Sequence, residues 1–472
     1  MSEGKNFPEA DKNGETECIT RPPEPLAAEQ KAKSKTATLT DQKEKASYLA
    51  AFSYFLLLLI LPNFVMLFAY TIIDLEGNIT QLIEILQSQD LQETMLQIWW
   101  PYAMGNYETW VIIMTFFVFE LILMFVLPGH RYVHVTCTGN ILHYKNNGLL
   151  SFIITITTFN ALVYYEVIDP SLVYNNFMYL MGALNLLVIG LSCILFVKGK
   201  LFPSTTDITS TRSIIVDFYK GIELHPKILC CDVKLFIHSR FAMMGWALLL
   251  LSFVHKQYAL FGMYSDSMVA AVVLQIIYIT KFFFWEQGYV KSLDITDDRA
   301  GFSSCWGNMV WVPCIYTSQT LYLITHPINL GLPLTTTLMI AGMWSIYINY
   351  EADFQKQDVR KNAQCKIWRN DVQVIKTNYK LKDGSETDTV LLLSGWWGVS
   401  RHFHYLPEVL AALCWSLPTL FNTLLPYFYV MYLVVLMASR TRRVDKRCQE
   451  KYGSDWEEYC KRVPYKIIPG VF

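Results

Sequence analysis

Residues 391–408, LLLSGWWGVSRHFHYLPE, form the most informative stretch of this sequence. The stretch is too polar to cross a bilayer and too aromatic for an ordinary solvent-exposed loop. Apolar runs of membrane length lie before and after it. Ionisable and aromatic residues at the edge of a membrane core indicate a functional site. The alternative is an interfacial belt of Trp and Tyr at headgroup level, which leaves Arg401, His402, His404 and Glu408 unexplained.

The composition of the whole chain supports a membrane protein. The 472 residues are 53% hydrophobic and 17% charged, with a mean hydropathy of +0.27, and such values are typical of polytopic membrane proteins. The net charge is −1, so no general basicity points to a nucleic acid partner. The 11 cysteines lack the spacing of a zinc site. We therefore predict mostly free, reduced thiols and no metal.

The N-terminal residues 1–46 are polar and lack apolar periodicity. We predict a disordered cytosolic tail here, without a cleavable signal peptide, followed by one membrane domain at 47–472. Lysines gather just before the first apolar run, which places the N-terminus in the cytosol by the positive-inside rule. Residues 74–108 contain acids but no Lys or Arg. We therefore predict that this segment lies on the lumenal side.

About ten apolar runs are predicted membrane spans, although several are shorter than the roughly 20 residues that a bilayer needs. They are Tyr48–Ile72, Trp110–Leu127, Leu149–Val167, Leu172–Val197, Phe241–Val254, Ser267–Trp285, Gly307–Thr325, Leu332–Tyr350, Glu408–Phe421 and Leu424–Ala438. The basic loops fall on one side if these spans alternate, and the tail after Arg440 is strongly basic. We therefore predict an all-α polytopic protein with both termini in the cytosol. Alternating polarity at 365–393, with a turn signal at Lys382–Gly384, predicts a small cytosolic β-hairpin insert.

Three polar groups recur on the predicted cytosolic side of the C-terminal half. Lys356 and Arg360 are four residues apart on a predicted helix, so both can point at one phosphate. The others are the stretch 391–408 and the basic, amphipathic segment Arg440–Tyr459. The alternatives for the two basic groups are snorkelling cations and a helix lying on anionic lipid. Together, cations and aromatic plates facing one pocket indicate a dinucleotide site, although no Rossmann glycine fingerprint is present.

A fourth group follows the apolar run that ends near residue 285. Glu286 closes an aromatic run, three aspartates follow between 294 and 298, and Tyr316 lies in the next predicted span. A carboxyl group in apolar surroundings is pushed toward its neutral form and can donate a proton. The alternative is that these acids cap helices or pair with Lys291 and Arg299.

The chain is identified as a member of the sterol reductase family of the endoplasmic reticulum, which includes the delta-14 reductases and the reductase domain of lamin B receptor. The stretches that carry the resemblance are Ile214–Pro226, Asp232–Phe236, Asp294–Phe302, Trp311–Thr317, 391–408, Lys451–Trp456 and Val463–Tyr465. The likeness spans about residues 48–472 and is greatest to the delta-7 reductases. It implies ten spans, with NADPH and sterol pockets built from about residues 281–472. The chain departs from the family at His404, Glu408 and Val444, where the family often has Asn, Asp and an acid.

Carried over position by position, the resemblance implies a set of cofactor-binding residues. These are Lys356, Arg360, Leu392, Trp397, Arg401, His404, Tyr405, Cys448, Gln449, Glu450, Lys451, Tyr452 and Tyr459. An isolated sterol double bond is not electrophilic enough for direct hydride attack, so a general acid should protonate it first. The candidate donors are Glu286, Asp294, Tyr316, Tyr405 and Glu408.

The expected function is NADPH-dependent reduction of the C7–C8 double bond of 5,7-diene sterols. The expected partners are a sterol drawn from the bilayer and other enzymes of sterol biosynthesis. The expected place is the endoplasmic reticulum membrane, given the substrate class and the basic termini. The alternatives are reduction of another sterol double bond, such as delta-14, and a non-catalytic sterol-binding or transport protein. An isoprenylcysteine-methyltransferase-like enzyme is a further alternative, against which the eight preceding spans and the Lys356–Arg360 pair argue.

Overall fold

The computed structural model describes residues 25–88, 90–135, 140–229, 231–362, 364–380 and 386–471. The chain divides into two units, Met1–Ser53 and Tyr54–Phe472. Helix α1 (Pro25–Ile73) begins inside the segment predicted to be a disordered tail. Residues 1–24 lie outside the described residues, so the tail and the domain boundary at 46 and 47 stay predictions.

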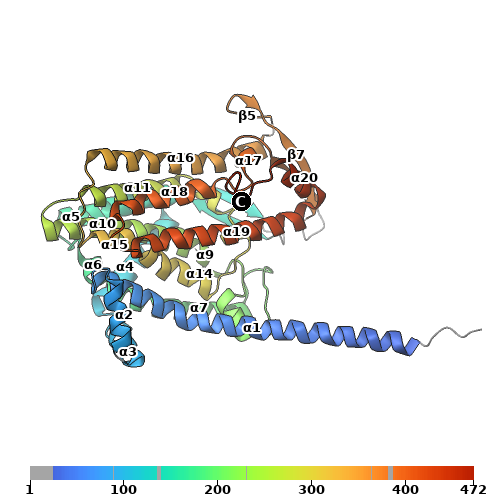
Figure 1. Cartoon of the computed structure of the whole chain (residues 1–472), viewed down its shortest axis with the longest axis horizontal. Helices are drawn as coiled ribbons and strands as arrows, with labels where there is room; N and C mark the ends of the chain where they lie inside the picture. The colour runs from blue at the N-terminus through green and yellow to red at the C-terminus, as the bar shows by residue number, and fades with distance from the viewer. Residues whose placement is uncertain are drawn as a thin grey trace, which may run out of the picture. The chain divides into compact units, whose positions relative to one another are not determined.

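Long apolar helices dominate the described chain (Figure 1). Five stretches are long and apolar enough to cross a membrane: Tyr48–Ile73 of α1, α4 (Tyr107–Val126), α7 (Phe177–Leu201), the continuous run Val233–Phe261 and α11 (Asp266–Phe284). The chain is therefore a multi-pass membrane protein.

The other predicted spans also contain helices. They are α5 (Gly148–Tyr164), α15 (Ser318–Leu323), α16 (Leu332–Lys361), α18 (Tyr405–Ser416) and α19 (Phe428–Tyr452). Helix α14 (Phe302–Trp306) directly precedes the predicted span that contains α15. Each predicted span thus overlaps helical residues, although the observed helices begin and end at other residues, and the total of ten crossings stays a prediction. Short helices fill the connections: α2 (Ile79–Ser88), α3 (Leu91–Trp99), α6 (Leu172–Asn175), α8 (Ile214–Lys220), α12 (Glu286–Tyr289), α13 (Leu293–Thr296), α17 (Trp396–Val399), η3 (Leu417–Thr419), η4 (Leu425–Tyr427) and α20 (Ser454–Arg462).

The described chain has two π-helical segments, one that overlaps the start of the predicted span Phe241–Val254 and one inside the predicted span Gly307–Thr325. Segment η1 (Phe236–Ala242) joins α9 (Val233–Leu235) to α10 (Met243–Phe261), and η2 (Gly307–Tyr316) joins α14 to α15. The two segments contact each other, and His238 Nδ1 lies 2.6 Å from Asn308 Oδ1 between them. The apolar pattern did not predict this geometry, because a π-helical turn has the same composition as an α-helical one. Single π-helical turns occur frequently at functional sites.

Four short antiparallel hairpins decorate the described part of the helical body. They are β1 (His130–Val135) with β2 (Ile141–Asn146), β3 (Lys227–Ile228) with β4 (Cys231–Asp232), β5 (Lys366–Ile367) with β6 (Asn370–Asp371), and β7 (Val374–Lys380) with β8 (Glu386–Leu392). The predicted insert is the β7–β8 hairpin, in which Val374 faces Leu392; its predicted turn lies outside the described residues. The expectation of an all-α fold with a single hairpin therefore needs correction to a mostly helical fold with several.

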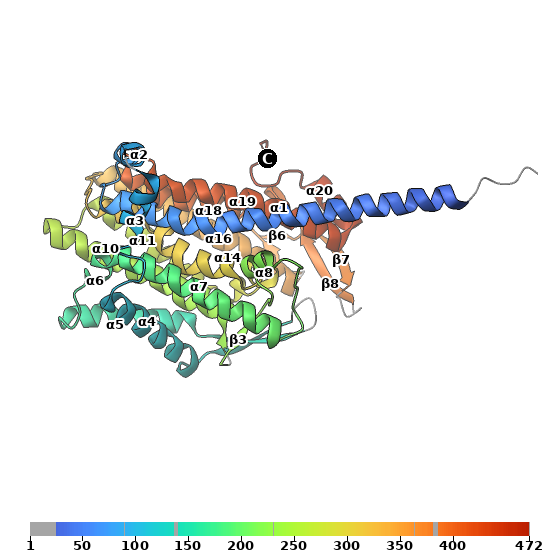
Figure 2. The same cartoon turned by 90° about the horizontal axis from the view of Figure 1, so that it is seen from below.

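The candidate site is positioned by four helices that pack together, α11, α16, α18 and α19. Helix α18 contacts the other three, and both views show α16, α18 and α19 running side by side (Figures 1 and 2). Where these helices end, α17, α20, β7 and the C-terminus gather (Figure 1). The apolar halves of the helices bury large side chains such as Trp415 and Tyr429. Their polar ends are left to form the walls of a cavity.

Candidate functional site

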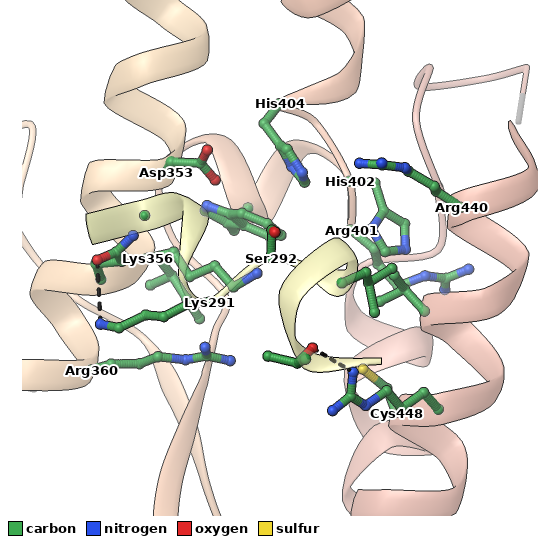
Figure 3. A pocket seen from close by; sticks show the side chains of 18 of the residues that line it. Lys291, Ser292, Asp353, Lys356, Arg360, Arg401, His402, His404, Arg440 and Cys448 are labelled. Atoms are coloured by element: carbon green, nitrogen blue, oxygen red, sulfur yellow. Dashed lines mark hydrogen bonds between the residues drawn. The ribbon is translucent and has the colours of Figure 1, made fainter. Parts of the chain in front are cut away.

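A cavity of about 620 Å³ opens between the polar ends of α11, α16, α18 and α19 (Figure 3). Residues of β7, β8, α20 and the segment 288–296 complete its wall. Eleven of the thirteen predicted cofactor residues line it: Lys356, Arg360, Leu392, Trp397, Arg401, His404, Tyr405, Cys448, Lys451, Tyr452 and Tyr459. The other two do not: Gln449 donates to Glu457 at 3.0 Å, and Glu450 lies 3.9 Å from Lys446.

Helix α16 carries the cationic pair, and both Lys356 and Arg360 line the cavity. The Lys356 ammonium lies 4.1 Å from the centre of the Trp397 ring. Burial and the neighbouring charge of Arg360 lower the pKa of Lys356 to about 8. Neither cation makes an ion pair with another described residue. Paired positive charges without a carboxylate partner are suited to an anionic ligand.

The backbone of the 391–408 stretch bends sharply at Gly395. Its φ of 64° lies in the left-handed region, and a Cβ there would lie 2.2 Å from the Gln355 Oε1 atom. Only glycine fits this position without strain. The turn starts α17 and presents Trp397, whose indole N–H donates to the Ala352 carbonyl at 2.7 Å. The ring of Trp397 therefore forms a fixed plate in the cavity wall.

The C-terminal segment holds the second half of the stretch. The backbone N–H of Arg401 donates to the carbonyl of Tyr465 at 3.0 Å, and that of His402 donates to Lys466 at 2.8 Å. The Arg401 side chain also donates to the carbonyl of Val463 at 3.2 Å. These bonds explain why a polar stretch can be buried here, because its backbone groups are satisfied.

Asp445 of α19, which the sequence did not single out, pairs with two residues of the cavity wall, Arg401 and His402. Its carboxylate lies 3.2 Å from His402, 3.7 Å from Arg401 and 3.4 Å from Lys466. Burial alone would raise the pKa of Asp445, but the His402 hydrogen bond and the nearby cations lower it. One observation in the sequence could have pointed to an acid here, because the family often has an acid at the neighbouring position 444. Val444 itself lines the cavity.

His404 has an unusual environment. Burial and the charge of Lys356 hold its pKa well below the usual histidine value, so the ring is neutral. The ring lies 4.2 Å from that of Tyr405 and 5.0 Å from that of Trp397. Its Nδ1 atom is buried and has no hydrogen-bond partner among the described residues. A ligand in the cavity can reach this atom and supply a hydrogen-bond partner.

At the inner end of the cavity, next to large apolar side chains, a tyrosine and a glutamate form a hydrogen-bonded pair. The Tyr278 hydroxyl of α11 donates to the Glu408 carboxylate of α18. The Tyr278 ring packs 5.4 Å from that of Trp415 and 5.9 Å from that of Trp246. Tyr278 was missed in the sequence because it lies within an apolar run, where a tyrosine resembles a core residue. Glu408 was predicted as a proton donor.

The other predicted donors occupy different places. Tyr405 lines the cavity, and burial raises its pKa to about 12. Glu286, Asp294 and Tyr316 do not line it. Glu286 is fully buried and pairs with Arg240 at 2.5 Å, Asp294 pairs with Arg440 at 2.5 Å, and Tyr316 packs on Tyr429.

The fold and the cavity define a class: a multi-pass helical membrane protein with a cationic, aromatic cavity at the ends of its apolar helices. Sequence comparison gives the family. Residues 44–472 match the Ergosterol biosynthesis ERG4/ERG24 family, and the chain belongs to this family of sterol reductases. The resemblance seen in the sequence is confirmed.

Three relatives illustrate this membership. The chain is 40% identical to the 7-dehydrocholesterol reductase of Arabidopsis thaliana over 88% of this chain and 96% of the relative. It is 36% identical to the 7-dehydrocholesterol reductase of Xenopus laevis over 71% and 72%. It is 33% identical to the Delta(14)-sterol reductase of Methylotuvimicrobium alcaliphilum over 71% and 76%. The protein is therefore an oxidoreductase of sterol biosynthesis that acts on a sterol within the bilayer.

Proposed function

We propose that this protein reduces the C7–C8 double bond of 5,7-diene sterols with NADPH. The observation that carries the proposal is one cavity that holds both the Lys356–Arg360 pair and the Tyr278–Glu408 pair. The choice of double bond follows the relatives, since identity is 40% to a 7-dehydrocholesterol reductase and 33% to a Delta(14)-sterol reductase. Reduction of the delta-14 bond is the second candidate, supported by the latter relative.

The residues of the cavity fit NADPH. From Asn349 to Arg360, α16 offers a wall on the order of 16 Å long, enough for an extended dinucleotide. Lys356 and Arg360 suit phosphate groups, and Trp397 and Tyr452 offer flat rings for stacking. The unpartnered Nδ1 of His404 can bond the carboxamide at the inner end. Bound NADPH would supply a hydride to the sterol.

The chain itself supplies the proton. The Tyr278–Glu408 pair lies at the apolar end, where a sterol can approach from the membrane. The pair gives a proton to one carbon of the double bond, so positive charge develops on the other carbon, which accepts the hydride. Water entering through the polar end of the cavity returns a proton to the pair.

We place the protein in the endoplasmic reticulum membrane, with ten spans and both termini in the cytosol. This orientation puts the cavity and the β7–β8 hairpin on the cytosolic side, where NADPH is available. Charge asymmetry between the loops supports the assignment. Other enzymes of sterol biosynthesis would supply the substrate and use the product.

The test uses microsomes from a host without its own delta-7 reductase that expresses this chain. After addition of a 5,7-diene sterol and NADPH, we expect the conjugated-diene absorbance to disappear. The Glu408→Gln and Tyr278→Phe variants should lose most turnover and keep nucleotide binding. The Lys356→Ala, Arg360→Ala double variant should instead raise the KM for NADPH. Glu450→Gln, outside the cavity, is the matched control and should behave as wild type.

Two results would contradict the proposal. Unchanged diene absorbance with well-folded protein moves the reaction to another double bond, which product analysis with a delta-14 sterol would detect. Sterol binding without NADPH oxidation for any substrate would make the protein a non-catalytic binder.

A further inference from the structure

Asp353 of α16 is an acidic side chain in a part of the cavity wall that is rich in cations. It lines the cavity and is half-buried. Its carboxylate makes no hydrogen bond and no ion pair with another residue in the described part of the chain. Burial raises the pKa of Asp353 above its usual value, although the charges of Lys356 and Lys281 oppose this. A carboxyl group withdrawn from water without a partner is costly, so a ligand that donates hydrogen bonds to it would be stabilised there.

Two neighbours on the same face of α16 define the position of Asp353. Asn349 precedes it by four residues and Lys356 follows it by three, and side chains at these spacings are adjacent on a helix. All three line the cavity, as does Arg360 one turn farther on. Figure 3 shows Asp353, Lys356 and Arg360 in that order along the helix, with their side chains extending from it toward the cavity. Along the helix axis, Asp353 lies about 4.5 Å from Lys356 and about 6 Å from Asn349.

Asn349 connects this face of α16 to the inner end of the cavity. Its side-chain oxygen accepts a hydrogen bond from the Lys281 ammonium, and its amide donates to the carbonyl of His404 at 2.8 Å. The Lys281 ammonium lies 4.9 Å from the centre of the ring of Tyr278, which belongs to the proposed proton-donating pair. Asp353 therefore lies one helical turn outward from the residues of the inner end.

The order of these groups along α16 matches the order of groups in a nicotinamide dinucleotide. The proposed function puts the nicotinamide at the inner end and the phosphates beside the Lys356–Arg360 pair. The nicotinamide ribose connects these two parts of the ligand, and its two adjacent hydroxyls are hydrogen-bond donors. The Asp353 carboxylate would repel a phosphate, whereas it can accept from both hydroxyls. Rossmann folds also hold a ribose through the hydroxyls that it donates to an acidic side chain.

We propose that the Asp353 carboxylate binds the hydroxyls of the nicotinamide ribose. The inference rests on the proposed function, since it takes NADPH as the ligand. It adds an acid to the cofactor residues that the family resemblance implies, among which the single carboxylate, Glu450, does not line the cavity. It also explains an acid between cations, because Asp353 positions the ribose and keeps the pyrophosphate beside Lys356.

The test measures nucleotide binding by the full-length protein in detergent. Nicotinamide fluorescence gives the Kd of NADPH and of an analogue whose nicotinamide ribose lacks its 2′-hydroxyl. Wild type should bind the analogue roughly tenfold more weakly than NADPH, the effect of one lost charge-assisted hydrogen bond. Asp353→Ala should weaken NADPH by about the same factor. It should also bind NADPH and the analogue equally, because the partner of the missing hydroxyl is gone.

A second ligand, 2′,5′-ADP, separates a ribose contact from a general effect of charge. It contains the adenosine ribose and lacks the nicotinamide ribose, so Asp353→Ala should bind it at least as tightly as wild type does. Asp353→Asn keeps a side-chain oxygen and should retain more affinity for NADPH than Asp353→Ala, and it repeats the test if the alanine variant folds poorly. Asp358→Ala is the matched control, because it removes an acid of the same helix that does not line the cavity, and it should change nothing.

The possible failures are distinguishable. If wild type binds no NADPH, the proposed function and this inference both fail. If wild type binds NADPH and Asp353→Ala binds it equally well, or still discriminates against the analogue, then the assignment of Asp353 to the ribose is wrong. Equal weakening of NADPH and 2′,5′-ADP in Asp353→Ala would also contradict it, because the lost contact would then lie outside the nicotinamide ribose.

Discussion

Lys356 shows how a single side chain can link the cavity to pH. Burial and the charge of Arg360 lower its pKa to about 8 from the usual 10.5. Between these two values the unfolded chain binds more protons than the folded one, so this group's contribution to the free energy of unfolding rises with pH. Phosphate binding has the opposite dependence. The protonated form of Lys356, which attracts phosphate, predominates below about pH 8 and is lost as the pH rises above that value.

We therefore predict that kcat/KM for NADPH falls above about pH 8 in the wild-type protein. Replacing Lys356 by Arg should remove this decline, because the arginine pKa remains above about 12. The measurement is the rate at limiting NADPH between pH 6.5 and 9.5, at constant ionic strength and saturating sterol. A decline that persists unchanged in Lys356→Arg would mean that another group titrates.

The residues that sequence reasoning found and missed differ in physical type. Lys356, Arg360 and Trp397 were predicted because cations and paired tryptophans next to apolar runs are conspicuous. Asp445 and Tyr278 were missed because each has its partner on another element, Asp445 opposite His402 and Tyr278 opposite Glu408. Such pairing across helices has no pattern within a single sequence window.

At the scale of elements, a buried ion pair holds the first π-helical segment in place. Arg240 of η1 pairs with Glu286 of α12 at 2.5 Å and donates to Asn147 at 2.9 Å. Glu286 also accepts from the backbone N–H of Gly148, the first residue of α5. Three elements thus meet at one carboxylate. The location of Glu286 away from the cavity makes a structural role the simpler explanation of its burial.

We predict that Glu286→Gln destabilises the protein without abolishing turnover by the molecules that remain folded. Removing one partner of a buried ion pair costs about 3–5 kcal/mol, because the other charge is left unpaired. The measurements are the thermal unfolding midpoint in detergent and the turnover per folded molecule. Glu458→Gln, which removes an exposed pair with Arg462, should change little. If the variant instead lost turnover and kept its stability, the result would support the prediction that Glu286 is the proton donor.

The helices themselves were largely predictable from the sequence. Each predicted span overlaps helical residues, since a long apolar run has few other solutions in a bilayer. The β7–β8 hairpin was also predicted, because its residues alternate in polarity. The π-helical segments, the pairing of residues 294–298 with α19 and the smaller hairpins were not predicted. Their geometry depends on contacts between distant segments, such as His238 with Asn308, rather than on local pattern.

At the scale of the whole molecule, the distribution of charge predicts which side of the membrane the cavity faces. The cavity lies at the end of the helical body where α20 and the C-terminal segment gather (Figure 1). The C-terminal part of α19 and the segment after it are basic. Residues 74–108 contain no Lys or Arg. The positive-inside rule therefore predicts that the cavity lies on the cytosolic side and residues 74–108 on the lumenal side.

We predict that activity in sealed microsomes is not latent. NADPH does not cross membranes, so an enzyme whose cavity faces the cytosol should consume diene at the same rate before and after a mild detergent opens the vesicles. Epitope tags at both termini should be digested by added protease in sealed vesicles, whereas a tag after Ser88 should be protected until the membrane is opened. The combination matters, because tags report the orientation of the chain and latency reports the orientation of the cavity. Exposed termini together with latent activity would mean that the cofactor enters from the other side, and the assignment of the cationic cavity to NADPH would then be wrong.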